Sequence, residues 1–104
     1  RDTDPAMVPE LLSVFLVDGR ERLQKLQAAL AAEDTAALQA EAHALGSSAG
    51  TFGLPSIHDL ARAVEAAIRD GDIGTGIDLS NTLIEAAPTA FEALNRFMEE
   101  TKPE

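Results

Sequence analysis

The feature that most constrains the fold of this chain is the spacing of its apolar residues, which recur at intervals of three and four positions. Such spacing places side chains on one face of an α-helix, whereas a half-buried strand requires strict alternation, and no segment alternates in that way. Ala and Leu dominate the composition, and both favour helix. The sequence therefore predicts four helices, whose apolar stripes are Leu12, Phe15, Leu16, Leu23, Leu26 and Leu30; Leu38, Ala42, Leu45 and Ala49; Ile57, Leu60, Ala61, Val64 and Ile68; and Ile84, Ala87, Phe91, Leu94 and Met98.

Capping and turn residues separate the first two predicted helices. Pro9 suits the first turn of a helix, because the N–H that proline lacks would be unpaired there anyway. The block Asp18-Gly19-Arg20 interrupts the first stripe, which indicates either a short helix joined to a longer one or a single bent helix. Asp34 or Thr35 is the expected N-cap of the second helix, which runs over about residues 35–49.

The second half of the chain carries similar signals. Gly50 and Gly53 mark the end of the second helix, and Pro55 opens the third helix at its first turn. Residues 70–72, Asp-Gly-Asp, form a tight turn. The last helix begins between residues 73 and 78. Pro88 is expected to kink this helix rather than end it, because the apolar stripe continues in phase beyond the proline.

Four amphipathic helices with short connections predict an all-α fold, an up-and-down antiparallel four-helix bundle whose N-terminal helix is short or bent. A chain of this length suffices for one domain with one core, expected over residues 8–101. Residues 1–7 are expected to be a linker or a remnant of a longer chain, and residues 102–104 a frayed tail.

Charge and composition exclude several classes of function. The formal net charge is −10 and no basic cluster offsets it, so nucleic acid and anionic membranes are not expected partners. No apolar run approaches the roughly 20 residues that span a bilayer. The chain has no cysteine, which excludes a disulfide scaffold and a thiolate zinc site and fits a cytoplasmic location.

One titratable residue, His43, lies within a run of small residues in the second predicted helix. At about 100° per residue, His43 points roughly 140° away from the apolar stripe of that helix, toward solvent. Its neighbours one turn before and after it scarcely rise above the helix surface, so another macromolecule can reach the imidazole. This expected docking surface comprises Ala36, Gln39, Ala40, Gly46, Ser47 and Gly50.

Two other kinds of site compare poorly with a reactive histidine. Residues 46–50, Gly-Ser-Ser-Ala-Gly, superficially resemble the nucleophile elbow of a serine hydrolase, but that turn needs a strand before its serine. A di-iron bundle repeats Glu-x-x-His on two helices, whereas here Glu41 precedes His43 by two positions and His58 has no such partner, so no metal site is predicted. A lone exposed imidazole can accept a phosphoryl group; otherwise His43 is simply an exposed helix residue.

The segment around His43 resembles the histidine-containing phosphotransfer (Hpt) domain of bacterial phosphorelays. That family's pattern is His, any residue, Leu, often Lys, then Gly-Ser-Ser or Gly-Ser-Ala, and a Phe or Leu before a Gly ten positions past the His. The block over residues 60–65 and the Gly-Asp turn at 71–72 also look like the family's next helix and turn, and the helical plan fits residues 8–101. The motif residues that match in register are His43, Leu45, Ser48, Phe52 and Gly53.

The resemblance implies that His43 accepts a phosphoryl group from a receiver-domain aspartate or a kinase active site and passes it on. It also implies that Glu65, 22 positions after His43, hydrogen-bonds the imidazole. A carboxylate on one ring N–H fixes the tautomer and leaves the other nitrogen for attack. The implied partners are a response-regulator receiver domain, a sensor histidine kinase or both, and the module needs no cofactor and is not an enzyme by itself.

This sequence departs from the family pattern next to the histidine. Gly46 stands where the family often has Lys, and Ser47 where it usually has Gly. A cation at that place would stabilise a phosphoryl group, and Arg62 on the next helix, part of the expected docking surface, is a candidate substitute. Glu65 is alternatively a surface charge paired with Arg62 or Arg69, and His58 is expected to be structural or incidental. The alternative function is a helical interaction or dimerisation bundle without chemistry, in which His43 is dispensable.

Overall fold

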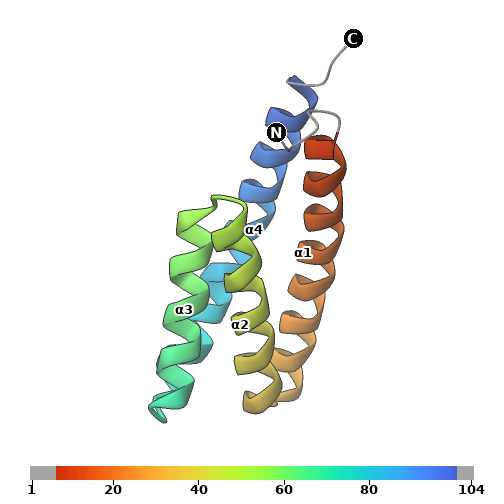
Figure 1. Cartoon of the computed structure of the whole chain (residues 1–104). Coiled ribbons are helices and arrows are strands. Elements are labelled where there is room, and N and C mark those ends of the chain that lie inside the picture. The colour runs from red at the N-terminus through yellow and green to blue at the C-terminus, as the bar shows by residue number, and fades with distance from the viewer. Residues whose placement is uncertain (1–6, 101–104) are drawn as a thin grey trace.

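The computed structural model describes residues 7–100, apart from the side chains of residues 7–9 and 98. Within this range the chain forms four helices: α1 (Met7–Ala32), α2 (Thr35–Thr51), α3 (Pro55–Arg69) and α4 (Ile73–Glu100). Each helix runs antiparallel to the one before it (Figure 1). The packed pairs are α1–α2, α2–α3, α3–α4 and α1–α4. The prediction of an all-α, up-and-down four-helix bundle is confirmed.

The first helix settles the choice left open at Asp18-Gly19-Arg20. α1 continues unbroken through this block, so the expectation of a separate short leading helix is wrong. Gly19 is buried, and a methyl group there would lie 3.0 Å from the ring of Phe91. The glycine therefore lies where α1 approaches the Phe91 ring of α4, and it does not break the helix.

The capping residues act largely as predicted. The Asp34 side chain accepts a hydrogen bond from the backbone N–H of Ala37 at 3.1 Å and caps α2. α2 ends at Thr51, two residues later than predicted, so Gly50 lies inside the helix and its expected place at the helix end is wrong. Gly53 follows in the left-handed region with φ 74°. Pro55 is the first residue of α3. These short connections hold α2 and α3 as an antiparallel pair.

The start of α4 is defined by the turn that precedes it. Gly71 takes φ 82°, and the Asp72 carboxylate accepts a hydrogen bond from the backbone N–H of Thr75 at 3.3 Å, so α4 begins at Ile73. The helix passes through Pro88 without ending. Met7 already belongs to α1, whereas the rest of the expected linker and the expected tail lie outside the described residues.

The core follows the predicted stripes on the first three helices, where only Leu30 and Leu60 are half-buried. On α4 the prediction is wrong by one position at Ile84, which is half-buried while Leu83 is fully buried. Both residues are apolar and adjacent, so the pattern alone did not distinguish them; Leu94 is also half-buried, and the Met98 side chain lies outside the described residues. The buried apolar residues of α1 and α4 include Leu12, Phe15, Leu16, Leu23, Leu26, Ala29, Leu83, Ala87 and Phe91.

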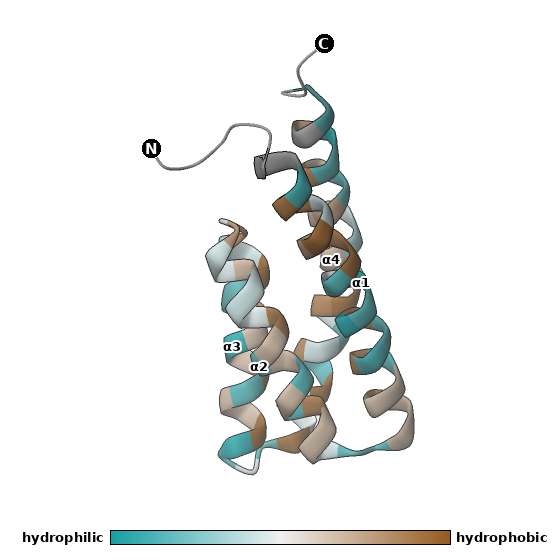
Figure 2. Cartoon of the chain, turned by 45° about the vertical axis from the view of Figure 1, so that its right-hand side comes forward, coloured by the Kyte–Doolittle hydropathy of each residue, from teal (hydrophilic) through white to brown (hydrophobic). Residues whose placement is uncertain are grey.

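The helices differ in length, and this determines which surfaces stay open. α1 and α4 have 26 and 28 residues, whereas α2 and α3 have 17 and 15. The N-terminal part of α1 and the C-terminal part of α4 therefore project beyond the α2–α3 connection (Figures 1 and 2). The projecting half of α1 is strongly apolar (Figure 2), and Leu11, Val14 and Val17 are largely exposed.

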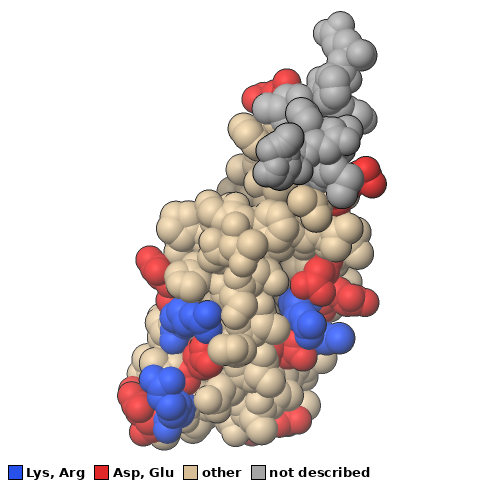
Figure 3. All heavy atoms as spheres, viewed as in Figure 1, with Lys and Arg blue, Asp and Glu red and all other residues tan. Residues whose placement is uncertain are grey.

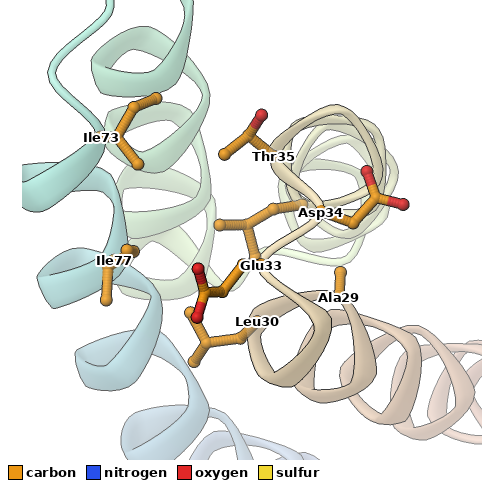
Figure 4. Close-up of a pocket in the computed structure, with 8 residues that line it drawn as sticks. Ala29, Leu30, Glu33, Asp34, Thr35, Ile73 and Ile77 are labelled. Carbon is orange, nitrogen blue, oxygen red and sulfur yellow. The ribbon is translucent and has the colours of Figure 1, made fainter.

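At the opposite end of the bundle, an unusual residue joins α1 to α2. Glu33 has φ 56°, in the left-handed region that favours glycine. The N–H groups of Glu33 and Asp34 donate to the carbonyls of Leu30 and Ala29, which closes the C-terminus of α1. Glu33 also borders an apolar cavity of about 110 Å³ between α1, α2 and the start of α4, where Ile73 and Ile77 form the far wall (Figure 4).

Candidate functional site

His43 lies in the middle of α2, on the side turned away from the core. Its side chain is 60% exposed. The opposite side of the helix carries Leu38, Ala42 and Leu45, which are buried. The structure thus places the imidazole toward solvent, as the periodicity indicated. At the middle of the molecule, the visible charged side chains gather over α3 and over α1, and the surface over α2 between them has few (Figure 3).

α3 brings Glu65 against the His43 ring. The distance from His43 Nδ1 to Glu65 Oε2 is 2.7 Å, and only 16% of the Glu65 side chain is exposed. The two helices pack closely here because Gly46 on α2 faces Ala61 on α3. A methyl group on Gly46 would lie 3.1 Å from the Ala61 side chain. The contact implied by the family resemblance is therefore present, and Glu65 is not merely a surface charge.

Arg62 is the second partner of Glu65. Its Nη1 donates to Glu65 Oε1 at 2.8 Å, and its Nη2 donates to the Ser47 hydroxyl at 3.3 Å. The two residues are one turn apart on α3, at the spacing where side chains of a helix meet. Each oxygen of the Glu65 carboxylate thus has its own donor, one on α2 and one on α3.

The two contacts at His43 Nδ1 determine the ring tautomer. Nδ1 lies 2.7 Å from Glu65 Oε2 and 3.2 Å from Arg62 Nη1, and a neutral ring nitrogen either donates or accepts. An ionised carboxylate only accepts, and its contact is the shorter one, so we assign the proton to Nδ1. His43 Nε2 then carries the lone pair. Arg62 lies beside Nδ1 without hydrogen-bonding it.

The electrostatics of Glu65 support this assignment. Burial by itself raises the pKa of Glu65, but the hydrogen bonds from Arg62 and His43 and the electrostatic attraction of both groups outweigh burial. The net result is a pKa below the ordinary value of a glutamate. Glu65 is therefore ionised at neutral pH and remains an acceptor for the imidazole.

The small residues predicted around His43 are partly confirmed as surface. Ala36, Gln39 and Ala40 line a shallow hollow together with His43 and Glu65. Ser47 and Gly50 are exposed further along α2. Gly46 is buried, so its expected place on the docking surface is wrong. Ala61 of α3 covers it, which reasoning from α2 alone did not reveal.

Of the two alternatives for His58, structural or incidental, its contacts favour a structural role. Its Nδ1 donates to the carbonyl oxygen of Gly46 at 2.9 Å. A methyl group on Gly50 would lie 2.9 Å from the same nitrogen, so the ring rests where α2 has no side chain at positions 46 and 50. The sequence signal was a pair of glycines four positions apart on one helix face.

The described residues contain no group of three or more histidine, aspartate or glutamate side chains arranged to hold a metal ion. Over the same residues, no helix has the length and apolarity to cross a membrane.

Comparison with protein-family models identifies the family of this chain. The family model of the Hpt domain matches residues 10–101, nearly the whole chain. The chain belongs to the Hpt domain family. Hpt domains serve phosphotransfer in two-component signalling and interact with receiver domains and kinases, as phosphocarrier modules and not as enzymes. A search of curated proteins and a search of solved structures each gave no match.

Several motif residues of this Hpt domain serve the fold rather than the nucleophile. Leu45 is buried in the core and Ser48 is half-buried. The Phe52 ring stacks on Phe15 of α1 with centroids 4.6 Å apart. Gly53 supplies the left-handed residue of the α2–α3 turn. These residues fix α2 against its neighbours, and so they determine where His43 emerges.

Proposed function

We propose that this Hpt domain is a phosphorelay intermediate, in which His43 accepts a phosphoryl group and transfers it to or from a receiver-domain aspartate. The observation that carries the proposal is the 2.7 Å contact between His43 Nδ1 and Glu65 Oε2, in which the Glu65 side chain is largely buried and the His43 side chain is largely exposed. This pairing holds one nitrogen and leaves the other free to attack. Because Hpt domains are generally cytoplasmic, we propose the same location for this one.

The transfer forms one bond and breaks one. The lone pair on His43 Nε2 attacks the phosphorus of an aspartyl phosphate on the receiver and forms an Nε2–P bond. The bond from phosphorus to the aspartate oxygen breaks, and its electron pair returns to the aspartate carboxylate. The proton on Nδ1 stays in place, so the phosphorylated ring is positively charged and the Glu65 carboxylate offsets that charge. Transfer to a receiver reverses these steps.

The surface around His43 suits the approach of such a partner. Ala36, Ala40, Ser47 and Gly50 are exposed and small, so few long side chains on α2 obstruct the approach of a receiver aspartate to the ring. In this proposal the acceptor aspartate and any magnesium ion belong to the partner. The Hpt domain contributes the nucleophile, its orientation and a low surface around it.

The proposal is tested by incubating the domain with phosphorylated receiver domains. We expect an acid-labile, alkali-stable label on the wild-type protein and none on His43→Gln. Circular dichroism checks that the variant keeps its helices, since an exposed side chain is replaced by one of similar size. Absence of label on the wild type with several receivers and kinases, or equal label on His43→Gln, overturns the proposal.

The second candidate function is an interaction or dimerisation bundle without chemistry. The exposed apolar residues Leu11, Val14 and Val17 on α1 favour it, because large apolar side chains are 49–68% exposed there. This candidate predicts that His43→Gln keeps full function and that the wild type takes no label. The labelling experiment therefore separates the two.

A further inference from the structure

Arg62 stands closer to the proposed nucleophile than an ion pair with Glu65 requires. Its guanidinium spans three groups: Nη1 lies 2.8 Å from Glu65 Oε1 and 3.2 Å from His43 Nδ1, and Nη2 lies 3.3 Å from Ser47 Oγ. The side chain is 38% exposed, so its outer edge faces solvent next to the imidazole. A fixed positive charge thus lies at the edge of the ring in a chain whose net charge is −10.

One of the three contacts leaves a donor unused. An N–H of Arg62 Nη1 points at His43 Nδ1, but Nδ1 already carries a proton that it donates to Glu65, so it does not accept. Among the described residues, Glu65 is the acceptor that Nη1 has. A guanidinium beside the ring therefore retains hydrogen-bonding capacity that an incoming group with several acceptor oxygens would satisfy.

The backbone of α2 makes room for this guanidinium. A methyl group on Gly46 would lie 3.7 Å from Arg62 Cζ and Nη1, in ordinary contact, and a longer side chain there would compete for the same space. Ser47 follows His43 by one turn and is exposed. Its oxygen accepts from Arg62, which leaves its own O–H to donate. α3 thus supplies a cation and α2 a hydroxyl on one side of the ring.

From this arrangement we propose that Arg62 and Ser47 form a binding site for the phosphoryl oxygens of phosphorylated His43. The inference rests on the proposed function and adds the residues that hold the transferred group. A dianionic phosphoryl group on Nε2 draws the outer guanidinium N–H groups and the Ser47 hydroxyl, while Glu65 keeps its bond to the Nδ1 proton. Arg62 therefore binds two anions in turn or together, the Glu65 carboxylate and the phosphoryl group.

The test uses a small phosphodonor, so that no partner protein contributes charge. Phosphoramidate phosphorylates the domain: the ring nitrogen forms a bond to phosphorus, the P–N bond of phosphoramidate breaks and ammonia leaves. Phosphorus NMR then measures the second ionisation of the phosphoryl group as a function of pH. The signal of phosphorylated His43 is identified by its loss in His43→Gln, which separates it from any label on His58.

We expect Arg62→Gln to raise the pKa of the second phosphoryl ionisation by about one pH unit, because an adjacent cation favours the dianion. Ser47→Ala is expected to raise it by less, since a neutral donor is lost. Arg69→Gln is the matched control: it removes the same charge from the same helix, but Arg69 lies at the end of α3 next to Asp70. Its expected value equals that of the wild type.

Arg62→Gln made in the Glu65→Gln background distinguishes binding of the phosphoryl group from an indirect effect through Glu65. If Arg62 acts only by holding the Glu65 carboxylate, Arg62→Gln leaves the phosphoryl pKa unchanged in that background. If Arg62 binds the phosphoryl group, Arg62→Gln still raises the pKa there. A shift for Arg62→Gln no larger than for Arg69→Gln overturns the inference. Failure of the wild type to take label from phosphoramidate and from receivers overturns the proposed function instead.

Discussion

Replacing Glu65 by alanine tests the central contact of the site. The carboxylate accepts the Nδ1 proton at 2.7 Å, and during transfer the ring beyond that proton becomes positively charged. Two unit charges at that distance interact by about 1.5 kcal/mol in a medium as polar as water, and the 60% exposure of His43 argues for this low value. Since about 1.4 kcal/mol is a factor of ten in rate, we expect Glu65→Ala to slow transfer about tenfold.

The assay is a single-turnover transfer from a phosphorylated receiver, followed by loss of label from the receiver and its gain on the domain. Glu65→Gln is expected to fall between wild type and Glu65→Ala, because its amide oxygen still accepts the Nδ1 proton but carries no charge. Asp59→Ala on the exposed side of α3 is the matched control for loss of a carboxylate. Circular dichroism and thermal unfolding establish that the variants are folded. An unchanged rate for Glu65→Ala removes Glu65 from the site.

Three further predictions concern the stability of the fold. Because the pKa of Glu65 is lowered in the folded state, its contribution to stability is present above the unfolded value of about 4.5 and is lost as the pH falls through the folded-state pKa. The free energy of unfolding of Glu65→Gln, measured with denaturant between pH 3 and 7, should therefore depend less on pH than that of the wild type. The same pH dependence in both proteins contradicts this prediction. Glu33→Gly should raise the free energy of unfolding by about 1 kcal/mol by relieving the left-handed backbone at φ 56°, and a loss of stability refutes that reasoning. Gly50→Ala should destabilise the domain because its methyl group meets the His58 ring at 2.9 Å; the cost should shrink in the background of His58→Ala, and two independent, additive effects would show that the ring does not rest on that glycine.

The sequence predicts which residues are buried where the apolar stripe of a single helix is enough to define its inner face. The stripe through Leu38, Ala42 and Leu45 specifies its inner face without reference to any neighbour, and the structure buries all three. The choice between Leu83 and Ile84 on α4 depends on how that helix is rotated against the rest of the bundle. Two adjacent apolar residues satisfy the same periodic pattern, so the sequence does not decide between them.

The site was predictable to a smaller extent, because it joins two helices. Periodicity places His43 toward solvent, but it contains nothing about which residue of α3 meets the ring. The pairing with Glu65 came from the spacing of 22 positions in a resembling family, and the structure has this contact at 2.7 Å. The contact of His58 with the α2 backbone was not predicted. The pair Gly46 and Gly50 indicates that another group approaches α2 closely, but it does not indicate which residue that is.

Gly46 has a different meaning on helix α2 alone than in the packed pair of α2 and α3. On α2 alone, a glycine three positions after His43 is a missing side chain, and it weakens the case for a site that handles a phosphoryl group. In the helix pair the same glycine allows the close approach of α3, because a methyl group at position 46 would lie only 3.1 Å from the Ala61 side chain. That approach carries Arg62 to the edge of the imidazole, at 3.2 Å from Nδ1. A longer side chain at position 46 would compete with Arg62 for this space, so we expect the effects of substitutions at the two positions to depend on each other.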